Sequence, residues 1–344
     1  MRKLFFLLLL LLGSSAAAVE SHAVVFMYHR FGETRFPSTN VRLEQFDAHL
    51  DWLAHNGYTV WPLDRIVSQL KSGEPIPDRT VAITVDDAYA SVYRRAWPRL
   101  RKRGWPLTVF VSTDAIDQRL PDYMRWEQMR ELAQEGVRFA NHGAAHAPLW
   151  KRRPGETHGV WRTRALADIN TGARRLKEEL GDAVSANVFA YPYGEYDDAL
   201  ADLCTELGYV VFGHHSGVIG HSSDRRALPR FPMSERYASL KEFATKAAAL
   251  PLQVESAPAD PLARDNPPVM EVALAPAELP WARLACYAGG DPIAVRWTEP
   301  GRRFQVTAPV PLSPGRARYS CTVPDGTRFR WYTQPWLIEA ARLR

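Results

Sequence analysis

The stretch Val81-Ala82-Ile83-Thr84-Val85-Asp86-Asp87 joins five residues typical of a buried β-strand to two adjacent carboxylates. In α/β proteins the ends of such strands carry the functional side chains. A second strand-like run, residues 137–140, is followed by His142 and His146. Carboxylates and imidazoles are common ligands of divalent metals. The two strand ends together therefore predict a metal site with a spare carboxylate beside it.

Amphipathic helices alternate with apolar strands along the first part of the chain. The candidate strands lie near residues 23–28, 58–60, 81–85, 107–111, 137–140, 187–191 and 209–212. Apolar strands that alternate with helices indicate a parallel sheet covered by those helices. No glycine-rich phosphate loop follows any strand, which disfavours a nucleotide-binding sheet. We therefore predict an α/β fold, a distorted (β/α) barrel of about seven parallel strands.

The character of the sequence changes after residue 250. Five prolines fall within residues 251–268, which predicts a linker without helix or sheet. Residues 269–344 alternate polar with apolar and aromatic side chains, and Asp325-Gly326 is typical of a hairpin turn. The predicted organisation is a barrel domain over 19–250, the linker, and a small C-terminal β domain.

Residues 1–18 have the pattern of a signal peptide, with a basic start, a short apolar run and three alanines. The apolar run is too short to span a bilayer, so we expect a protein exported to the periplasm or secreted, with no stable membrane span. In an oxidising compartment, Cys286 and Cys321 are expected to pair and to staple the small β domain.

The net charge gives little reason to expect a polyanionic partner. Removal of Arg2 and Lys3 with the signal peptide lowers the formal charge from +5 to +3. This charge is too small and too dispersed for a nucleic-acid footprint. We expect no nucleic-acid partner and a monomeric protein.

Asp86 and Asp87 are expected to have different roles, because successive side chains of a strand point to opposite faces. One carboxylate and two imidazoles would form a three-ligand metal site with open positions. The other carboxylate could take a proton from a water molecule there, which favours a metal-assisted hydrolase. A glycosidase is disfavoured, because adjacent residues rarely reach the carboxyl separation of roughly 5 to 9.5 Å that it needs.

Three segments, in this order, resemble the motifs of the polysaccharide deacetylases, the carbohydrate esterase family 4 or NodB homology group. Residues 84–91 resemble the first motif, 142–148 the second and 191–194 the third. The resemblance extends from about residue 24 to residue 231. The usual late Leu-x-His motif is missing, and His29 instead ends the first strand. This order is similar to the circularly permuted branch that deacetylates poly-β-1,6-N-acetylglucosamine.

The resemblance implies that Asp86 is the general base and that Asp87, His142 and His146 bind a divalent metal. Zinc is the first candidate, with cobalt or nickel as alternatives. Tyr193 would offer its backbone N–H to the oxyanion. The residues agree with this role, because the preceding proline has no N–H and Tyr193 therefore carries the first donor.

The source of the general acid and the support of the base are less directly indicated. The resemblance makes His29 the candidate acid, and a loop histidine bonded to backbone is the alternative. The rival acids His214, His215 and His221 are interpreted as ordinary loop residues. Ala190 stands where many members have an arginine that orients the base, and Arg230 could replace it from another strand.

Four further residues are expected to contact the substrate. Tyr89 and Trp126 could flank a sugar ring, although both could equally belong to the core. Tyr191 and Gly194 belong to the third motif, and Gly194 would let backbone approach the substrate closely.

The resemblance implies a metal-dependent hydrolase that removes N-acetyl, or else O-acetyl, groups from an acetylated polysaccharide or oligosaccharide outside the cytoplasm. The alternative is a catalytically weak or inactive glycan-binding protein on the same fold. Ala190 and the missing late motif favour that alternative, whereas the complete set of Asp86, Asp87, His142 and His146 argues against it.

Overall fold

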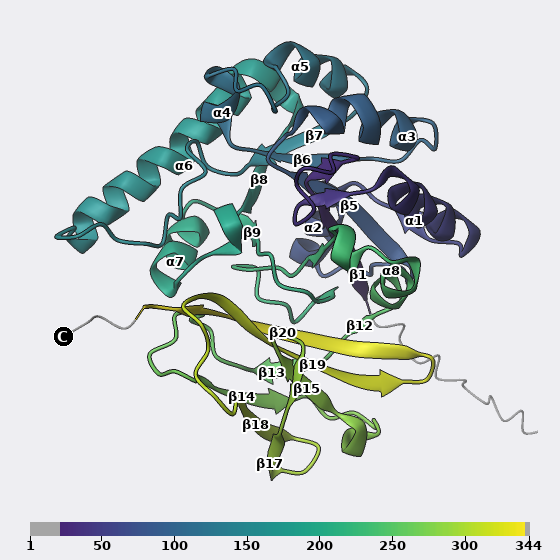
Figure 1. The fold of residues 1–344 in the computed structure, drawn as a ribbon, viewed down its shortest axis with the longest axis vertical. Helices are drawn as coiled ribbons and strands as arrows, with labels where there is room; N and C mark the ends of the chain where they lie inside the picture. The colour runs from purple at the N-terminus through teal and green to yellow at the C-terminus, as the bar shows by residue number, and fades with distance from the viewer. Residues whose placement is uncertain (1–20, 341–344) are drawn as a thin grey trace, which may run out of the picture.

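The computed structural model describes residues 21–340, so the predicted signal peptide lies outside the described residues. Two parts are visible in Figure 1, one rich in helices and one made almost entirely of strands. We call residues 21–249 the barrel region and residues 250–340 the β region. Among the described residues, no helix combines the length and the apolarity needed to cross a membrane.

A curled sheet forms the centre of the barrel region. Six strands lie side by side in the order β1-β5-β6-β7-β8-β9, and each pair of neighbours is parallel. Their bounds are β1 His22–Tyr28, β5 Thr80–Asp86, β6 Thr108–Val111, β7 Arg138–Asn141, β8 Val184–Ala190 and β9 Val210–Phe212. The seventh predicted strand, β4 (Thr59–Val60), pairs parallel with the start of β5. The predicted distorted barrel is therefore confirmed.

Both faces of this sheet are covered, which explains the continuous apolar runs in the sequence. Val81, Ile83 and Val85 of β5 pack into one hydrophobic cluster, whereas Ala82 packs into a second cluster with Phe110 and Ala190. Every residue of β5 is buried. Because side chains alternate between the two faces, Asp86 lies on the same face as Ala82, inside the curl of the sheet.

Eight α-helices flank the sheet in Figure 1. They are α1 Leu43–His55, α2 Leu63–Ser72, α3 Trp97–Arg101, α4 Thr113–Asp117, α5 Trp126–Gln134, α6 His158–Leu180, α7 Asp198–Glu206 and α8 Leu240–Ala247. The longest, α6, begins after Thr157, whose side chain accepts a hydrogen bond from the Val160 N–H as an N-cap. Its buried residues recur every three or four positions, so one face of α6 packs on the sheet.

An irregular segment closes the gap between the two ends of the curled sheet. The Leu228 N–H donates to the Val211 carbonyl of β9 at 2.7 Å. Three residues later, β11 (Phe231–Pro232) pairs parallel with Phe26 and Met27 of β1. The short strand β10 (Ile219–Gly220) covers the other half of β1, in the antiparallel sense. Residues 228–232 therefore span from β9 to β1 and place Arg230 inside the curl.

The β region contains two sheets, with strand orders β12-β20-β19-β15-β16 and β13-β14-β18-β17. The strands are β12 Leu250–Pro251, β13 Val254–Ser256, β14 Val269–Leu274, β15 Ala285–Ala288, β16 Asp291–Ile293, β17 Val295–Glu299, β18 Arg303–Thr307, β19 Gly315–Asp325 and β20 Arg328–Ile338. A disulfide joins Cys286 to Cys321 directly across β15 and β19. The turn between β19 and β20 places Gly326 at φ 59°, as the hairpin signal requires.

The prediction that residues 251–268 lack secondary structure is wrong. Pro251 belongs to β12, which pairs with β20, and β13 pairs with β14. Both strands lie at the edge of their sheet, where a proline is tolerated because its missing N–H costs no ladder bond. The domain boundaries taken from composition stay a prediction.

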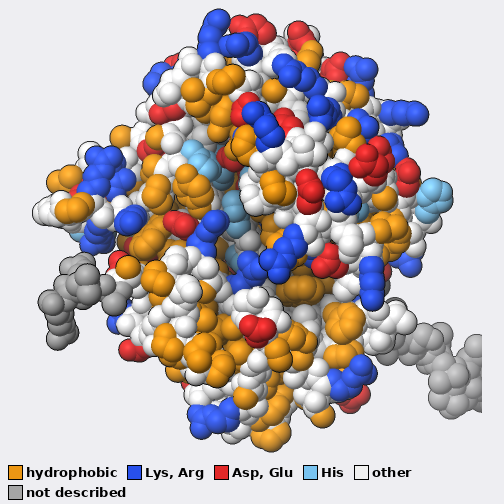
Figure 2. Space-filling view, viewed as in Figure 1, with side chains coloured by type: hydrophobic (Ala, Val, Ile, Leu, Met, Phe, Trp, Pro, Cys, Tyr) orange, Lys and Arg blue, Asp and Glu red, His pale blue; other side chains and the backbone are white. Residues whose placement is uncertain are grey.

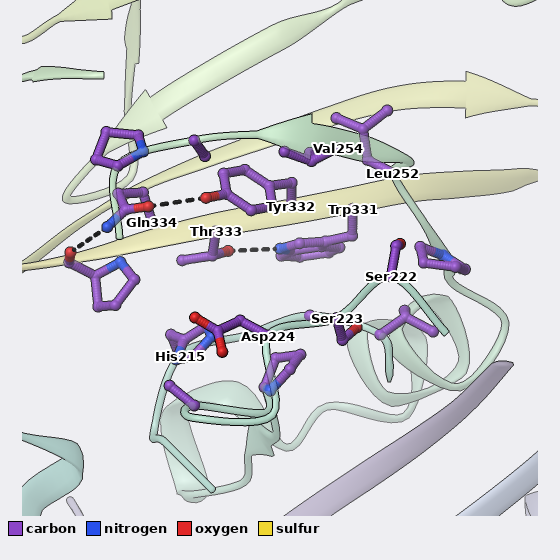
Figure 3. A pocket seen from close by; sticks show the side chains of 18 of the residues that line it. His215, Ser222, Ser223, Asp224, Leu252, Val254, Trp331, Tyr332, Thr333 and Gln334 are labelled. Carbon is purple, nitrogen blue, oxygen red and sulfur yellow. Dashed lines mark hydrogen bonds between the residues drawn. The ribbon is translucent and has the colours of Figure 1, made fainter. Parts of the chain in front are cut away.

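β20 makes several of the contacts between the two regions. Trp331 packs edge-on against Phe231 of the barrel region with 5.2 Å between ring centroids. Arg328 donates to Asp78 at 3.0 Å. A cleft of about 370 Å³ lies beside residues 331–335 of β20. Thr333 and Asp224 lie on opposite sides of this cleft (Figure 3). The regions therefore touch at separated points rather than across one continuous core.

A buried histidine joins α1 to the segment before α8. The ring of His49 stacks on Phe243 with 4.0 Å between centroids. Its Nε2–H donates to the Ala238 carbonyl at 2.9 Å, and its Nδ1 accepts from the Tyr28 hydroxyl at 3.1 Å. These bonds suit a neutral imidazole, and burial lowers the pKa of His49 to about 4.

We predict that His49 makes stability depend on pH. The unfolded chain binds a proton at this residue below about pH 6.5, whereas the native state resists protonation until about pH 4. The contribution is therefore complete above pH 6.5 and is lost as the pH falls toward 4. The unfolding free energy of wild type relative to His49→Leu should fall by about 3 kcal/mol between pH 7 and pH 4.

Chemical denaturation at a series of pH values measures this difference. His55→Leu, at the exposed end of the same helix, is the matched control and should run parallel to wild type. A curve for His49→Leu that also runs parallel to wild type would contradict the prediction.

Candidate metal centre and active site

The two carboxylates that end β5 point in different directions because the backbone turns sharply between them. Asp86 is the last residue of β5 and is fully buried. Asp87 and Ala88 follow with φ of 72° and 53°, both in the left-handed region that residues with a Cβ seldom adopt. This turn ends the alternation of the strand. The two carboxylates therefore diverge because of a backbone turn, and not because of the strand alternation that the sequence argument assumed.

Asp87 meets the two histidines of the second motif. Its Oδ1 lies 3.1 Å from His146 Nε2 and 3.7 Å from His142 Nε2. The ligand atoms of all three side chains lie within 4.8 Å of one another. His142 Nδ1–H donates to the Ala190 carbonyl at 2.8 Å, which leaves Nε2 to face Asp87. This Nε2 is buried and has no hydrogen-bond partner, so the three residues fit a divalent metal.

The protonation states of two of these side chains, His142 and Asp87, also suit a metal. Burial lowers the pKa of His142 to about 4, so its imidazole is neutral at neutral pH. Burial acts to raise the pKa of Asp87, but the hydrogen bond from His146 and the charges of His29, His142 and His146 together outweigh it and hold this pKa well below its usual range. A carboxylate and a neutral imidazole are the forms that bind metal.

The loop that carries both histidines is held by α6. Asp168 accepts hydrogen bonds from the Ala144 and Ala145 N–H groups at 2.9 and 3.1 Å. Asn141 accepts from the Gly143 N–H at 2.9 Å. Sequence reasoning missed Asp168, because nothing in its helical context marks it as a partner of a loop 24 residues earlier. The loop that carries His142 and His146 is thus fixed by Asp168 and Asn141, which are not among the candidate metal ligands.

Asp86 is held by a buried arginine from the segment that closes the barrel. Arg230 donates Nη1–H to Oδ1 at 2.7 Å and Nη2–H to Oδ2 at 2.8 Å, and neither side chain is exposed. Burial acts to raise the pKa of Asp86, but Arg230 and a hydrogen bond from His214 hold it well below its usual range. Arg230 therefore contacts the carboxylate that an arginine at the position of Ala190 orients in many family members.

His214 is more than the ordinary loop residue that the sequence indicated. Its Nε2–H donates to Asp86 Oδ2 at 2.9 Å, and burial lowers its pKa to about 3. The signal was available, because His214 follows the end of β9 as His29 follows β1. Gly194 makes room for it, since a Cβ there would lie 2.5 Å from the His214 Cβ. The close approach that Gly194 permits is thus an approach of its backbone to His214.

The other candidate acids are His29, His215 and His221, and they have different surroundings. His29 is half-buried, and one of its nitrogens lies within 4.8 Å of both an Asp86 oxygen and a His214 nitrogen. His215 packs its Nδ1 against Gly213. His221 is exposed after β10. The structure therefore brings His29 to the carboxylates.

Tyr193 forms the other side of the site. Its backbone has φ 61° and ψ 0°, and its ring packs edge-on against His146 with 4.4 Å between centroids. The residue is 39 % exposed. Figure 2 shows histidine side chains in a hollow of this face, beside Lys and Arg side chains at the junction with the β region.

Three predicted substrate contacts belong to the core instead. Tyr89 is 9 % exposed because the Arg30 guanidinium lies over its ring at 3.5 Å. Trp126 is equally buried and donates to Asp117 at 2.7 Å. Tyr191 is fully buried and donates its hydroxyl proton to the Arg226 carbonyl. The low exposure of these side chains and their contacts within the protein are typical of core packing.

Comparison with known proteins shows similarity over part of the chain. Residues 73–212 match the family model described as polysaccharide deacetylase. The chain is 29 % identical over 243 residues to the poly-β-1,6-N-acetyl-D-glucosamine N-deacetylase of Escherichia coli strain K12. That match covers 62 % of this chain but 36 % of the relative, so the chain spans little more than a third of its length.

Solved structures share the fold of the barrel region. The deacetylase PplD of Streptococcus pyogenes, solved with acetate, matches with a TM-score of 0.57 at 22 % identity and covers 66 % of this chain and 99 % of PplD. IcaB from Ammonifex degensii matches with a TM-score of 0.57 at 25 % identity and covers 66 % of this chain and 97 % of IcaB.

We predict that Arg230→Met destabilises the protein by about 3 to 5 kcal/mol, because it leaves the Asp86 charge buried and unpaired. Adding Asp86→Asn to Arg230→Met removes that charge and should recover more than half of the loss. Arg303→Met, which removes an exposed arginine 3.7 Å from Glu299, is the control and should cost less than about 1 kcal/mol. Unfolding in denaturant measures all three. Equal losses for the two arginine variants would refute the dependence of Asp86 on Arg230.

Proposed function

We propose that this chain, whose residues 73–212 match the polysaccharide deacetylase family model, removes N-acetyl groups from an acetylated polysaccharide or oligosaccharide outside the cytoplasm. O-acetyl groups are the second candidate. One observation carries the proposal: Asp87 faces two histidines, one with an unpartnered buried nitrogen, while Asp86 beside it is held separately by Arg230. The name of the Escherichia coli relative supports N-acetylglucosamine units as the substrate.

We propose that the reaction depends on a divalent metal held by Asp87, His142 and His146. Zinc is the first candidate, because two imidazoles and one carboxylate leave positions open in its coordination sphere, and cobalt or nickel are alternatives. Such a metal would polarise the acetyl carbonyl and lower the pKa of a water molecule, which suits a base whose own pKa is low.

The remaining groups divide the proton transfers between them. Asp86 takes the proton of the attacking water on Oδ1, which accepts one hydrogen bond from Arg230, whereas Oδ2 accepts two. The water oxygen bonds to the acetyl carbon, and the Tyr193 N–H donates to the oxyanion that forms. His29 then protonates the leaving nitrogen as the carbon–nitrogen bond breaks. The products are acetate and a free amine.

The alternative of a glycan-binding protein without turnover is not favoured. Its support was the alanine at position 190 and the missing late histidine motif. Arg230 reaches Asp86 from the closing segment, and His29 lies beside the same carboxylate. Arg230 and His29 are thus proposed to take the places of the arginine absent at position 190 and of the missing late histidine.

The proposed location outside the cytoplasm rests on the pattern of residues 1–18 and on the Cys286–Cys321 disulfide, a bond typical of oxidising compartments. A monomer that needs no nucleic-acid partner remains the proposed state. The sugar polymer itself is proposed as the partner of the hollow beside the histidines in Figure 2.

We predict that Asp87→Ala abolishes both metal retention and acetate release from N-acetylglucosamine oligomers. Elemental mass spectrometry after dialysis measures the metal, and added Zn²⁺ should raise the melting temperature of wild type but not of the variant. Asp202→Ala, which removes an exposed carboxylate of α7, is the control. Undiminished acetate release by Asp87→Ala would reject the mechanism.

We predict that His29→Gln lowers kcat for acetate release from the oligomers by about 100-fold, because the leaving amine needs a proton. Hydrolysis of p-nitrophenyl acetate, whose leaving group needs none, should fall much less. Metal content should stay at the wild-type level. His221→Gln, in an exposed loop, controls for the loss of a histidine. Equal losses on both substrates would remove His29 from the role of acid.

A further inference from the structure

A side chain of the β region reaches the third motif of the barrel region. Arg316, near the start of β19, donates Nη1–H to the Tyr193 carbonyl at 2.8 Å. Its Nε lies 3.6 Å from Glu195 Oε1. Glu195 in turn accepts from the Trp150 indole N–H at 2.9 Å. The contact thus joins two regions separated by more than a hundred residues in the sequence.

The carbonyl that Arg316 contacts belongs to a strained turn. Tyr193 has φ 61°, and a residue with a Cβ pays about 1 to 2 kcal/mol to adopt this conformation. Such conformations persist only where the surroundings hold them. Within the turn, the Gly194 N–H donates to the Tyr191 carbonyl at 2.8 Å, and the Glu195 N–H donates to the Pro192 carbonyl at 3.2 Å. Arg316 adds a hydrogen bond from outside the turn.

Two functional groups depend on how this turn is oriented. The Tyr193 N–H is the proposed oxyanion donor, and the Tyr193 ring packs on the proposed metal ligand His146. A rotation of the peptide between Tyr193 and Gly194 would also move the backbone that packs on His214. Small displacements of such groups are costly in catalysis, because the donor must meet the oxyanion at hydrogen-bond distance.

The stability of the interface does not explain the contact. The Arg316 side chain is 55 % exposed, and exposed ion pairs contribute less than about 1 kcal/mol. The β region is already attached through Trp331, which packs on Phe231, and Arg328, which donates to Asp78. The cleft of Figure 3 lies along the middle of β20, so Arg316 forms a separate point of contact.

We propose that Arg316 is a positioning residue for the active site: by holding the Tyr193 carbonyl it fixes the turn of residues 191–195, and this turn carries the Tyr193 N–H that is proposed to donate to the oxyanion. The β region then completes the active site of the barrel region instead of serving only as an appended domain. This inference rests on the proposed function, because it assigns Arg316 a part in the same reaction.

The test compares Arg316→Ala, Arg316→Lys and Arg318→Ala in the full chain. Arg318 lies on the same strand, two residues further along, and is likewise exposed, so it is a matched control. For acetate release from N-acetylglucosamine oligomers, Arg316→Ala should lower kcat by roughly 10-fold to 100-fold with KM within about twofold. Arg316→Lys, which keeps one donor, should recover part of kcat. Metal content and melting temperature should match wild type.

Hydrogen–deuterium exchange of peptides covering residues 190–196 gives a second readout, independent of turnover. Exchange there should be faster in Arg316→Ala than in wild type, and unchanged in Arg318→Ala. Equal kcat values for the two alanine variants, a loss confined to KM, or unchanged exchange would overturn the proposal. If wild type releases no acetate, the proposed function fails, and the exchange measurement still decides whether Arg316 holds the turn.

Discussion

The pair between Asp86 and Arg230 is the interaction on which the rest of the site depends. Both side chains are fully buried, and a charge in such a place is tolerated only when it is paired with good geometry. The bidentate contact meets this condition, and it requires the closing segment to run from β9 to β1. The segment that closes the curled sheet is therefore also the segment that supports the proposed base.

A local backbone feature then separates the two carboxylates. Asp86 follows the alternation of β5 and points inside the curl, whereas the left-handed Asp87 leaves the strand and meets His142 and His146. Arg230 and His214 both donate to Asp86, whereas Asp87 faces the two histidines. The two adjacent carboxylates thus have different partners, as the proposed roles of base and ligand require.

Sequence patterns predicted local features and only some of the long-range ones. The strands follow from apolar runs, and the pairing of His142 with His146 follows from spacing within one loop. The assignment of Asp87 to these histidines came from the family resemblance, as did the expectation of an arginine near Asp86. Asp168 and the role of His214 depend on contacts between segments far apart in the chain, which no local period reports. The proline-rich stretch was misread because composition does not reveal a free sheet edge where β12 can pair. Tyr89 and Trp126 were ambiguous for the same reason, since only packing decides which aromatic faces are covered.

The turn at residues 191–195 is where these separate supports meet. Tyr193 packs on His146 of the metal loop, Gly194 admits His214 beside the base, and the Tyr193 carbonyl receives Arg316 from the β region. Each contact constrains a different atom of one strained turn, so none can shift without altering the geometry seen by the others. A strained conformation of this kind persists where the surrounding structure holds it. The β region is therefore best understood as part of the framework that holds it.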